Sequence, residues 1–189
     1  ALNKTQDDFS VKALRLFIEQ LKGDDIVIVT AANTDPFKDV LWLIDVFDEL
    51  DISAQWLPLD GTISQNIPSK LQEEQRNSEC SKLDSFRANT TGRFNRSAIY
   101  PKLHEILVEY CESPEENTEL IDDADGVLFW GENPYTLMLA LTDISGSATK
   151  EWQHIKRKHN KGELVIAANG GAVHAFSSKT NRAGAIISG

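Results

Sequence analysis

The sequence holds few of the residues that build disulfide frameworks and metal centres. It has two cysteines, Cys80 and Cys111, and four histidines. The cysteines are too few for a framework, and neither residue type follows a ligand spacing such as HExxH. We therefore predict no metal site and no cofactor. A Cys80–Cys111 pair in an oxidising compartment stays open, but we favour two unrelated thiols.

Long apolar runs and an excess of basic residues are also missing. No run approaches the roughly 20 apolar residues that span a bilayer, so no membrane partner is expected. Lys and Arg number 19 against 29 Asp and Glu, which gives a formal net charge of −10. Because nucleic-acid binding depends on Lys and Arg neutralising phosphates, no nucleic-acid partner is expected either. A peptide or a small molecule fits better. A homodimer is left open, as is the compartment, with the cytoplasm slightly favoured over secretion.

What the sequence does contain is an alternation of helical periodicity with short, continuous apolar runs. The length of 189 residues suits one well-buried domain. We predict helices over 9–21, 37–50, 101–111, 133–141 and 148–158, and strands over 26–29, 54–59, 126–130, 164–167 and 183–187. Continuous apolar strands alternating with helices are typical of a parallel sheet covered on both faces. The fold class predicted for residues 1–189 is therefore a single α/β domain, a three-layer sandwich with a mostly parallel sheet.

A polar insertion at about 60–98 breaks this alternation. The segment from Asp60 to Ser97 is rich in Ser, Asn, Gln, Glu and Arg and lacks apolar periodicity. We predict helix only around Lys70 to Arg76 and a mobile chain elsewhere. A flap that faces a substrate is the alternative, but we favour a solvated insertion.

Two loops carry candidate site residues, because loops at the carboxyl ends of parallel strands are where α/β sheets place function. One is Gly131-Glu132-Asn133-Pro134. The other, Ala168-Asn169-Gly170-Gly171, has the strand-to-helix form of a nucleophile elbow, with Asn169 expected at the strained apex. Gly170 and Gly171 would leave backbone N–H groups open to an oxyanion. A glycine-rich turn also occurs for phosphate binding or for close packing.

Three segments together resemble peptidase family S51, the cyanophycinase and dipeptidase E group. They are the first thirty residues, "GVLFWGENP" from Gly126, and "VIAANGGAV" from Val165. The last two are similar to the family's Gly-Gly-Asn-Gln or Gly-Gly-Asp-Gln loop and its Gly-Thr-Ser-Ala-Gly-Ala elbow. The resemblance implies a flavodoxin-like sandwich related to class I glutamine amidotransferases. It also implies a serine that, with a histidine, attacks peptide bonds in cyanophycin or Asp-X dipeptides.

The match departs from the family where the chemistry is concentrated. Asn169 falls on the serine position, while Gly131 and Asn133 match the other loop. In that loop Glu132 replaces a glycine and Pro134 replaces the usual glutamine. His174 lies on the predicted elbow helix and is expected to be a packed or surface residue, so the catalytic histidine is not identified. We also expect both ends of the chain to be cropped relative to the family.

These observations leave three hypotheses. The favoured one is a degenerate S51-like protein that has lost serine chemistry and still binds an Asp- or Arg-containing peptide, because an amide is a poor nucleophile. The second is an active hydrolase that uses Asn169 after deamidation as a nucleophile, or Glu132 as a general base. The third is a non-enzymatic interaction domain whose insertion is the functional surface.

Overall fold

The computed structural model describes residues 8–176 and contains one all-parallel sheet. Its strands are β1 (Asp25–Val29), β2 (Ser53–Trp56), β3 (Gly126–Trp130) and β4 (Val165–Asn169). They lie in the order β2-β1-β3-β4. The register places Val27 opposite Val127. The predicted α/β class is confirmed, and the continuous apolar runs are indeed the central strands.

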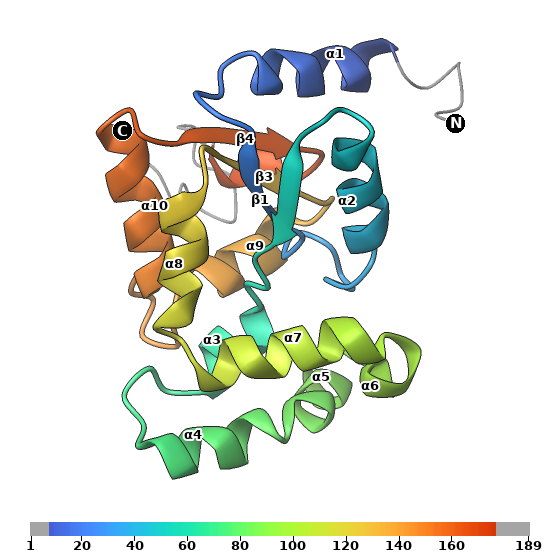
Figure 1. Cartoon of the computed structure of the whole chain (residues 1–189). Helices are drawn as coiled ribbons and strands as arrows, with labels where there is room; N and C mark the ends of the chain where they lie inside the picture. The colour runs from blue at the N-terminus through green and yellow to red at the C-terminus, as the bar shows by residue number, and fades with distance from the viewer. Residues whose placement is uncertain (1–7, 177–189) are drawn as a thin grey trace.

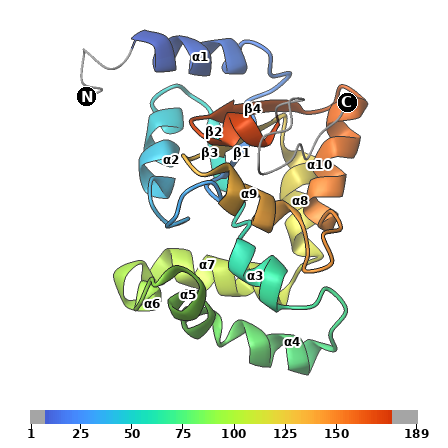
Figure 2. The ribbon, with the colours of Figure 1, turned by 180° about the vertical axis from the view of Figure 1, so that it is seen from behind.

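Helices cover both faces of this sheet and make three layers (Figures 1 and 2). On one face, α1 (Asp8–Ile18) and α2 (Val40–Asp48) pack through Phe17 and Phe47 onto Ile26, Ile28 and Leu128. The other face is covered by α8 (Glu116–Asp123), α9 (Pro134–Leu141) and α10 (Lys150–Asn160). There the alternate strand residues, such as Val127 and Phe129, contact the helices. Each central strand is thus buried on both sides.

A second group of helices lies beyond the carboxyl ends of the strands, at the lower end of Figure 1. We call it the helical layer: α3 (Gly61–Asn66), α4 (Glu73–Cys80), α5 (Leu83–Thr91), α6 (Arg96–Ile99) and α7 (Pro101–Glu112). The prediction of a solvated and mostly mobile insertion at 60–97 is wrong, because helices α3 to α6 fill most of it. Arg76, Cys80, Leu83 and Arg87 are buried there.

Specific contacts, in place of apolar periodicity, hold α4 against α7. The Arg76 guanidinium donates hydrogen bonds to the backbone carbonyls of Pro68, Ser69 and Cys111. Cys80 and Cys111 form a disulfide with their Cα atoms 5.8 Å apart, within the range that the bond requires. The prediction of two unrelated thiols is therefore wrong. Helix packing brings together two cysteines that are 31 residues apart in the sequence.

Several boundaries differ from the predictions. The helix predicted over 37–50 begins at Val40, after a left-handed Asp39 (φ 68°), and the strand predicted over 54–59 ends at Trp56. The acidic segment before β3 is helical, as α8. The strand predicted over 183–187 lies outside the described residues. No helix among residues 8–176 is long and apolar enough to cross a membrane.

Candidate functional site at the carboxyl edge of the sheet

The carboxyl ends of β1 and β3 lie side by side at the switch point of the sheet, where the order of successive strands reverses. From β1 the chain moves to β2 on one side, whereas β3 leads to β4 on the other. Such a switch point is where open α/β sheets bind ligands. The loop after β1 is fixed by Thr30, whose buried hydroxyl accepts a hydrogen bond from Trp56 Nε1 (3.0 Å) and donates one to the Pro36 carbonyl.

The loop after β3 is tied to the loop after β1. The Asn133 N–H donates to the Ala32 carbonyl at 2.8 Å. Gly131 has φ 138°, and a Cβ atom there would overlap the backbone of Ala32. The close approach of the two loops therefore requires glycine at 131. Asn133 also caps α9, because its side-chain oxygen accepts hydrogen bonds from the N–H groups of the first helical turn.

The turn at the end of β4 has the geometry of an elbow, with one difference from the prediction. Asn169 is the last residue of the strand, paired with Trp130. The left-handed backbone conformation falls on Gly170 (φ 64°), and the short helix α11 (Ala172–Ala175) follows. The expectation that Asn169 holds the strained position is wrong. The apex of this turn is therefore a glycine, which carries no side chain.

The elbow and the β3 loop are in direct contact, so the structure brings all six predicted site residues together. The Ala172 N–H donates to the Gly131 carbonyl at 3.0 Å. A Cβ atom on Gly171 would overlap the backbone of Glu132. A Cβ atom on Gly170 would lie 2.9 Å from Glu132 Oε1. The exposed carboxylate of Glu132 thus borders the space where an apex side chain would project.

The histidines of the described chain do not pair with the elbow. His154 Nε2 lies 2.5 Å from Asp122 Oδ1, and His159 Nδ1 lies 2.9 Å from the Leu164 carbonyl. His104 faces Asp84 at 3.7 Å, and burial lowers its pKa below the ordinary value, an effect that the nearby Asp84 opposes. His174 is exposed on α11, the surface alternative of the predicted packed or surface residue. None of these histidine side chains, all of which lie within residues 8–176, is therefore a catalytic partner for the elbow.

Next to the switch point is a cavity of about 210 Å³. Its walls come from the loop after β1 (Ala31, Asn33, Asp35), from Asp60 after β2, from α9 (Tyr135, Thr136), and from Arg87 and Arg93 of the helical layer. The elbow residues and Glu132 do not line it. Sequence reasoning missed this site, because its arginines lie in the segment that was predicted to be solvated. A polar loop after the first strand was the one available signal.

In the described part of the chain, no group of three or more His, Cys, Asp or Glu side chains could hold a metal ion. The protein is thus of the α/β class with a parallel sheet. A cavity large enough for a small ligand lies at the switch point of that sheet. Comparison of the chain with family models, curated proteins and solved structures found no match.

Proposed function

We propose that this chain is a degenerate S51-like protein, which binds a peptide containing Asp or Arg at the elbow and does not cleave it. One observation carries the proposal. The left-handed apex of the elbow is Gly170, which has no side chain that could attack a carbonyl carbon. Covalent catalysis needs a nucleophile at that position and a base within hydrogen-bond reach of it.

Glu132, whose carboxylate borders the apex, supports binding over catalysis. A Cβ atom on Gly170 would lie 2.7 Å from the Gly131 carbonyl oxygen and 2.9 Å from Glu132 Oε1. A serine at 170 would therefore crowd the Gly131 carbonyl and the Glu132 carboxylate, so this elbow has little room for a nucleophilic side chain at its apex. The Glu132 carboxylate is exposed, and a carboxylate is the natural partner of an arginine guanidinium in a ligand.

A binding assay combined with an activity assay tests this proposal. Purified protein is incubated with cyanophycin and with β-aspartyl and Asp-X dipeptides, and both binding and release of product are measured. We expect binding without turnover. Turnover by the native protein would contradict the proposal. Absence of both binding and turnover would contradict it as well, and would favour the interaction-domain hypothesis.

Variants separate the roles of the apex, Gly170, and of Asn169, the last residue of β4. Asn169→Ser and Gly170→Ser, each alone and together with Glu132→Gly, are compared in the same assay. Turnover by a serine variant alone would support loss of the nucleophile and would identify its position. Glu132→Gln should weaken binding of arginine-containing peptides roughly tenfold, the effect of removing one charged hydrogen-bond partner. Glu163→Gln is the matched control. Glu163 is exposed and precedes the first residue of β4, at the opposite end of the strand from the elbow.

A further inference from the structure

We propose that the cavity at the switch point binds a small oxyanion, the carboxylate or phosphate group of a small molecule, through Arg87 and Arg93. The cavity of about 210 Å³ is not lined by Asn169, Gly170, Gly171 or Glu132. Binding there requires neither a peptide at the elbow nor hydrolysis. The inference therefore goes beyond the proposed function.

Arg87 is the main argument for an anion. Its side chain comes from α5, borders the cavity, and is only 3% exposed. One guanidinium nitrogen, Nη2, binds the Asp60 carboxylate, whereas Nε and Nη1 are buried and have no hydrogen-bond partner. Buried donors without partners cost free energy, and an arginine's more so because it is charged. An oxyanion in the cavity is the ligand whose chemistry would satisfy them.

The guanidinium is also held in a fixed position. Its central carbon lies 4.4 Å from the centre of the Phe37 ring, a cation–π contact. Asp60, its ion-pair partner, also accepts a hydrogen bond from the Thr62 N–H at 2.6 Å. Arg87 therefore loses little freedom when a ligand binds, which favours affinity.

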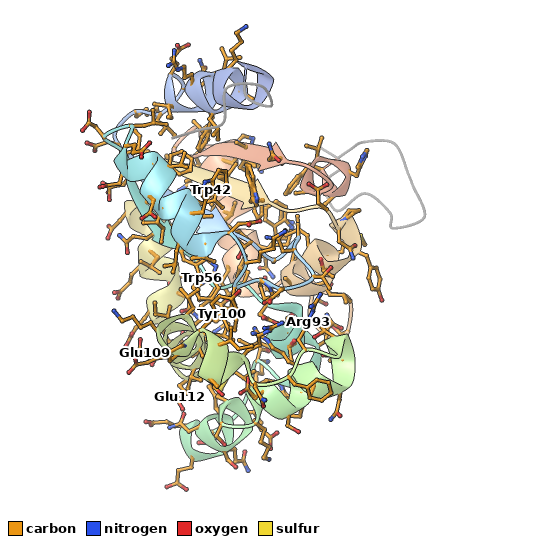
Figure 3. All side chains as sticks on the ribbon, turned by 90° about the vertical axis from the view of Figure 1, so that its right-hand side faces the viewer. Trp42, Trp56, Arg93, Tyr100, Glu109 and Glu112 are labelled. Atoms are coloured by element: carbon orange, nitrogen blue, oxygen red, sulfur yellow. A yellow bond between two sulfur atoms is a disulfide. The ribbon has the colours of Figure 1, made fainter. Side chains whose placement is uncertain are left out.

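The carboxylates of the cavity wall already have partners. Asp60 is bound by Arg87 and Thr62, and Asp35 pairs with Arg96 at 3.0 Å. Arg93 is different, because it is exposed and forms no ion pair with any residue of 8–176. Figure 3 shows Arg93 at the level where the sheet and the helical layer meet. Arg87 and Arg93 thus give the cavity cationic donors, in a protein whose formal net charge is −10.

The position and size agree with a small ligand. The walls come from segments that follow β1, β2 and β3, at the switch point of the sheet. Thr90 and Thr136 add polar side chains to the wall. A cavity of about 210 Å³ holds several water molecules and is below the usual range for drug-sized ligands, so it suits a molecule the size of a dicarboxylic acid.

The test uses the full chain and three probes: succinate, inorganic phosphate, and succinamide as the uncharged analogue of succinate. Calorimetry and thermal unfolding measure binding at low salt. We expect one of the two anions to bind and succinamide not to bind. Comparison of succinate with phosphate identifies the oxyanion. Failure of both anions to bind at millimolar concentration would overturn the inference, as would equal binding of succinamide.

Variants link binding to the two arginines. Arg93→Gln should weaken anion binding roughly tenfold, as expected for loss of a charged donor. Arg87→Lys keeps the charge beside Asp60 but removes the planar fork, and should weaken binding similarly. Arg15→Gln, at an exposed site on α1, is the matched control and should have no effect. Arg93 is exposed, so Arg93→Gln leaves the core unchanged. Undiminished anion binding by this variant would overturn the assignment of the anion site to the two arginines. Anion binding without peptide binding would reject only the proposed function.

Discussion

Cys80 at the end of α4 and Cys111 near the end of α7 are joined by a disulfide within the helical layer. Both residues are buried, with exposed fractions of 0% and 1%. The bond links α4, of which only the first part falls in the helix predicted around Lys70 to Arg76, to α7, which was predicted over 101–111. It shows why the segment after Asp60 is ordered although it has little apolar periodicity.

Removal of this disulfide should destabilise the protein. The double variant Cys80→Ala/Cys111→Ala opens a loop with a sequence separation of 31 residues, and the chain-entropy model gives a loss of about 3 to 4 kcal/mol in the free energy of unfolding. Urea unfolding of the variant and the native protein measures it. Because both sulfurs are buried, a mild reductant should release thiols only slowly while the protein stays folded. Rapid reduction without unfolding would contradict this packing.

The buried pair of Asp60 and Arg87 makes a second prediction. Their side chains are 5% and 3% exposed, so removal of one partner leaves an unpaired charge in the interior. Arg87→Met should lower the free energy of unfolding by about 3 to 5 kcal/mol. The double variant Asp60→Asn/Arg87→Met should recover part of that loss, since asparagine keeps the cap on α3 without the charge. Asp60→Asn alone completes the cycle, and a loss in the double variant equal to the sum of the two single losses would show that the pair is not coupled.

The contact between the elbow and the β3 loop predicts a strict need for glycine at 171. Gly171→Ala would drive its Cβ into the Glu132 backbone, and should cost roughly 3 kcal/mol or more, as overpacking against backbone does. Gly162→Ala is the control. Its φ is 71° but nothing lies within 4 Å of the added atom, so only the conformational cost of about 1 kcal/mol remains. Thermal unfolding of the two variants should separate them clearly.

The sheet could be predicted because its strands are simple in sequence. Residues such as Ile26 to Val29 form unbroken apolar runs, which central parallel strands require. The helical layer could not be predicted in the same way. Arg76 and Arg87 are buried there through bonds to backbone carbonyls and to Asp60, and such contacts leave no periodic signal.

The candidate site was likewise predictable from the sequence only in part. A strand followed by two glycines and a helix was enough to place the elbow and to bring it near Gly131. The sequence could not decide which residue takes the left-handed conformation, because both asparagine and glycine tolerate it. The cavity depended on tertiary contacts between distant segments, from Asp35 to Arg93, and was not visible in any one segment.

Tyr110 predicts a loss of stability at alkaline pH. Burial raises the pKa of its phenol well above the ordinary value, and the neighbouring Glu151 carboxylate, which accepts its hydrogen bond, raises it further. The unfolded chain loses this proton above about pH 10 while the folded protein keeps it. The stabilisation is therefore complete below that pH and is lost as the pH rises toward the folded pKa.

Unfolding in urea on both sides of pH 10 measures this effect for the native protein and for Tyr110→Phe. The phenylalanine variant should show a smaller decrease in the free energy of unfolding as the pH rises, because it has no proton to lose at 110. Ultraviolet absorbance should also show one tyrosine that ionises only when the protein unfolds. Ionisation of all three tyrosines in the folded state near the ordinary pKa would contradict the burial of Tyr110.

The last prediction concerns Asn169 and the hypothesis of an aspartate nucleophile. Deamidation requires the backbone nitrogen of Gly170 to attack the Asn169 carboxamide, and this needs a flexible backbone. Asn169 instead ends β4 in register with Trp130, and the chain after it is held by the bond from the Ala172 N–H to the Gly131 carbonyl. We expect peptide mapping of folded protein to find Asn169 intact, whereas protein incubated in denaturant should deamidate there much faster. A carboxylate at 169 in freshly purified, folded protein would contradict this prediction and would support the active-hydrolase hypothesis, because aspartate is a competent covalent nucleophile.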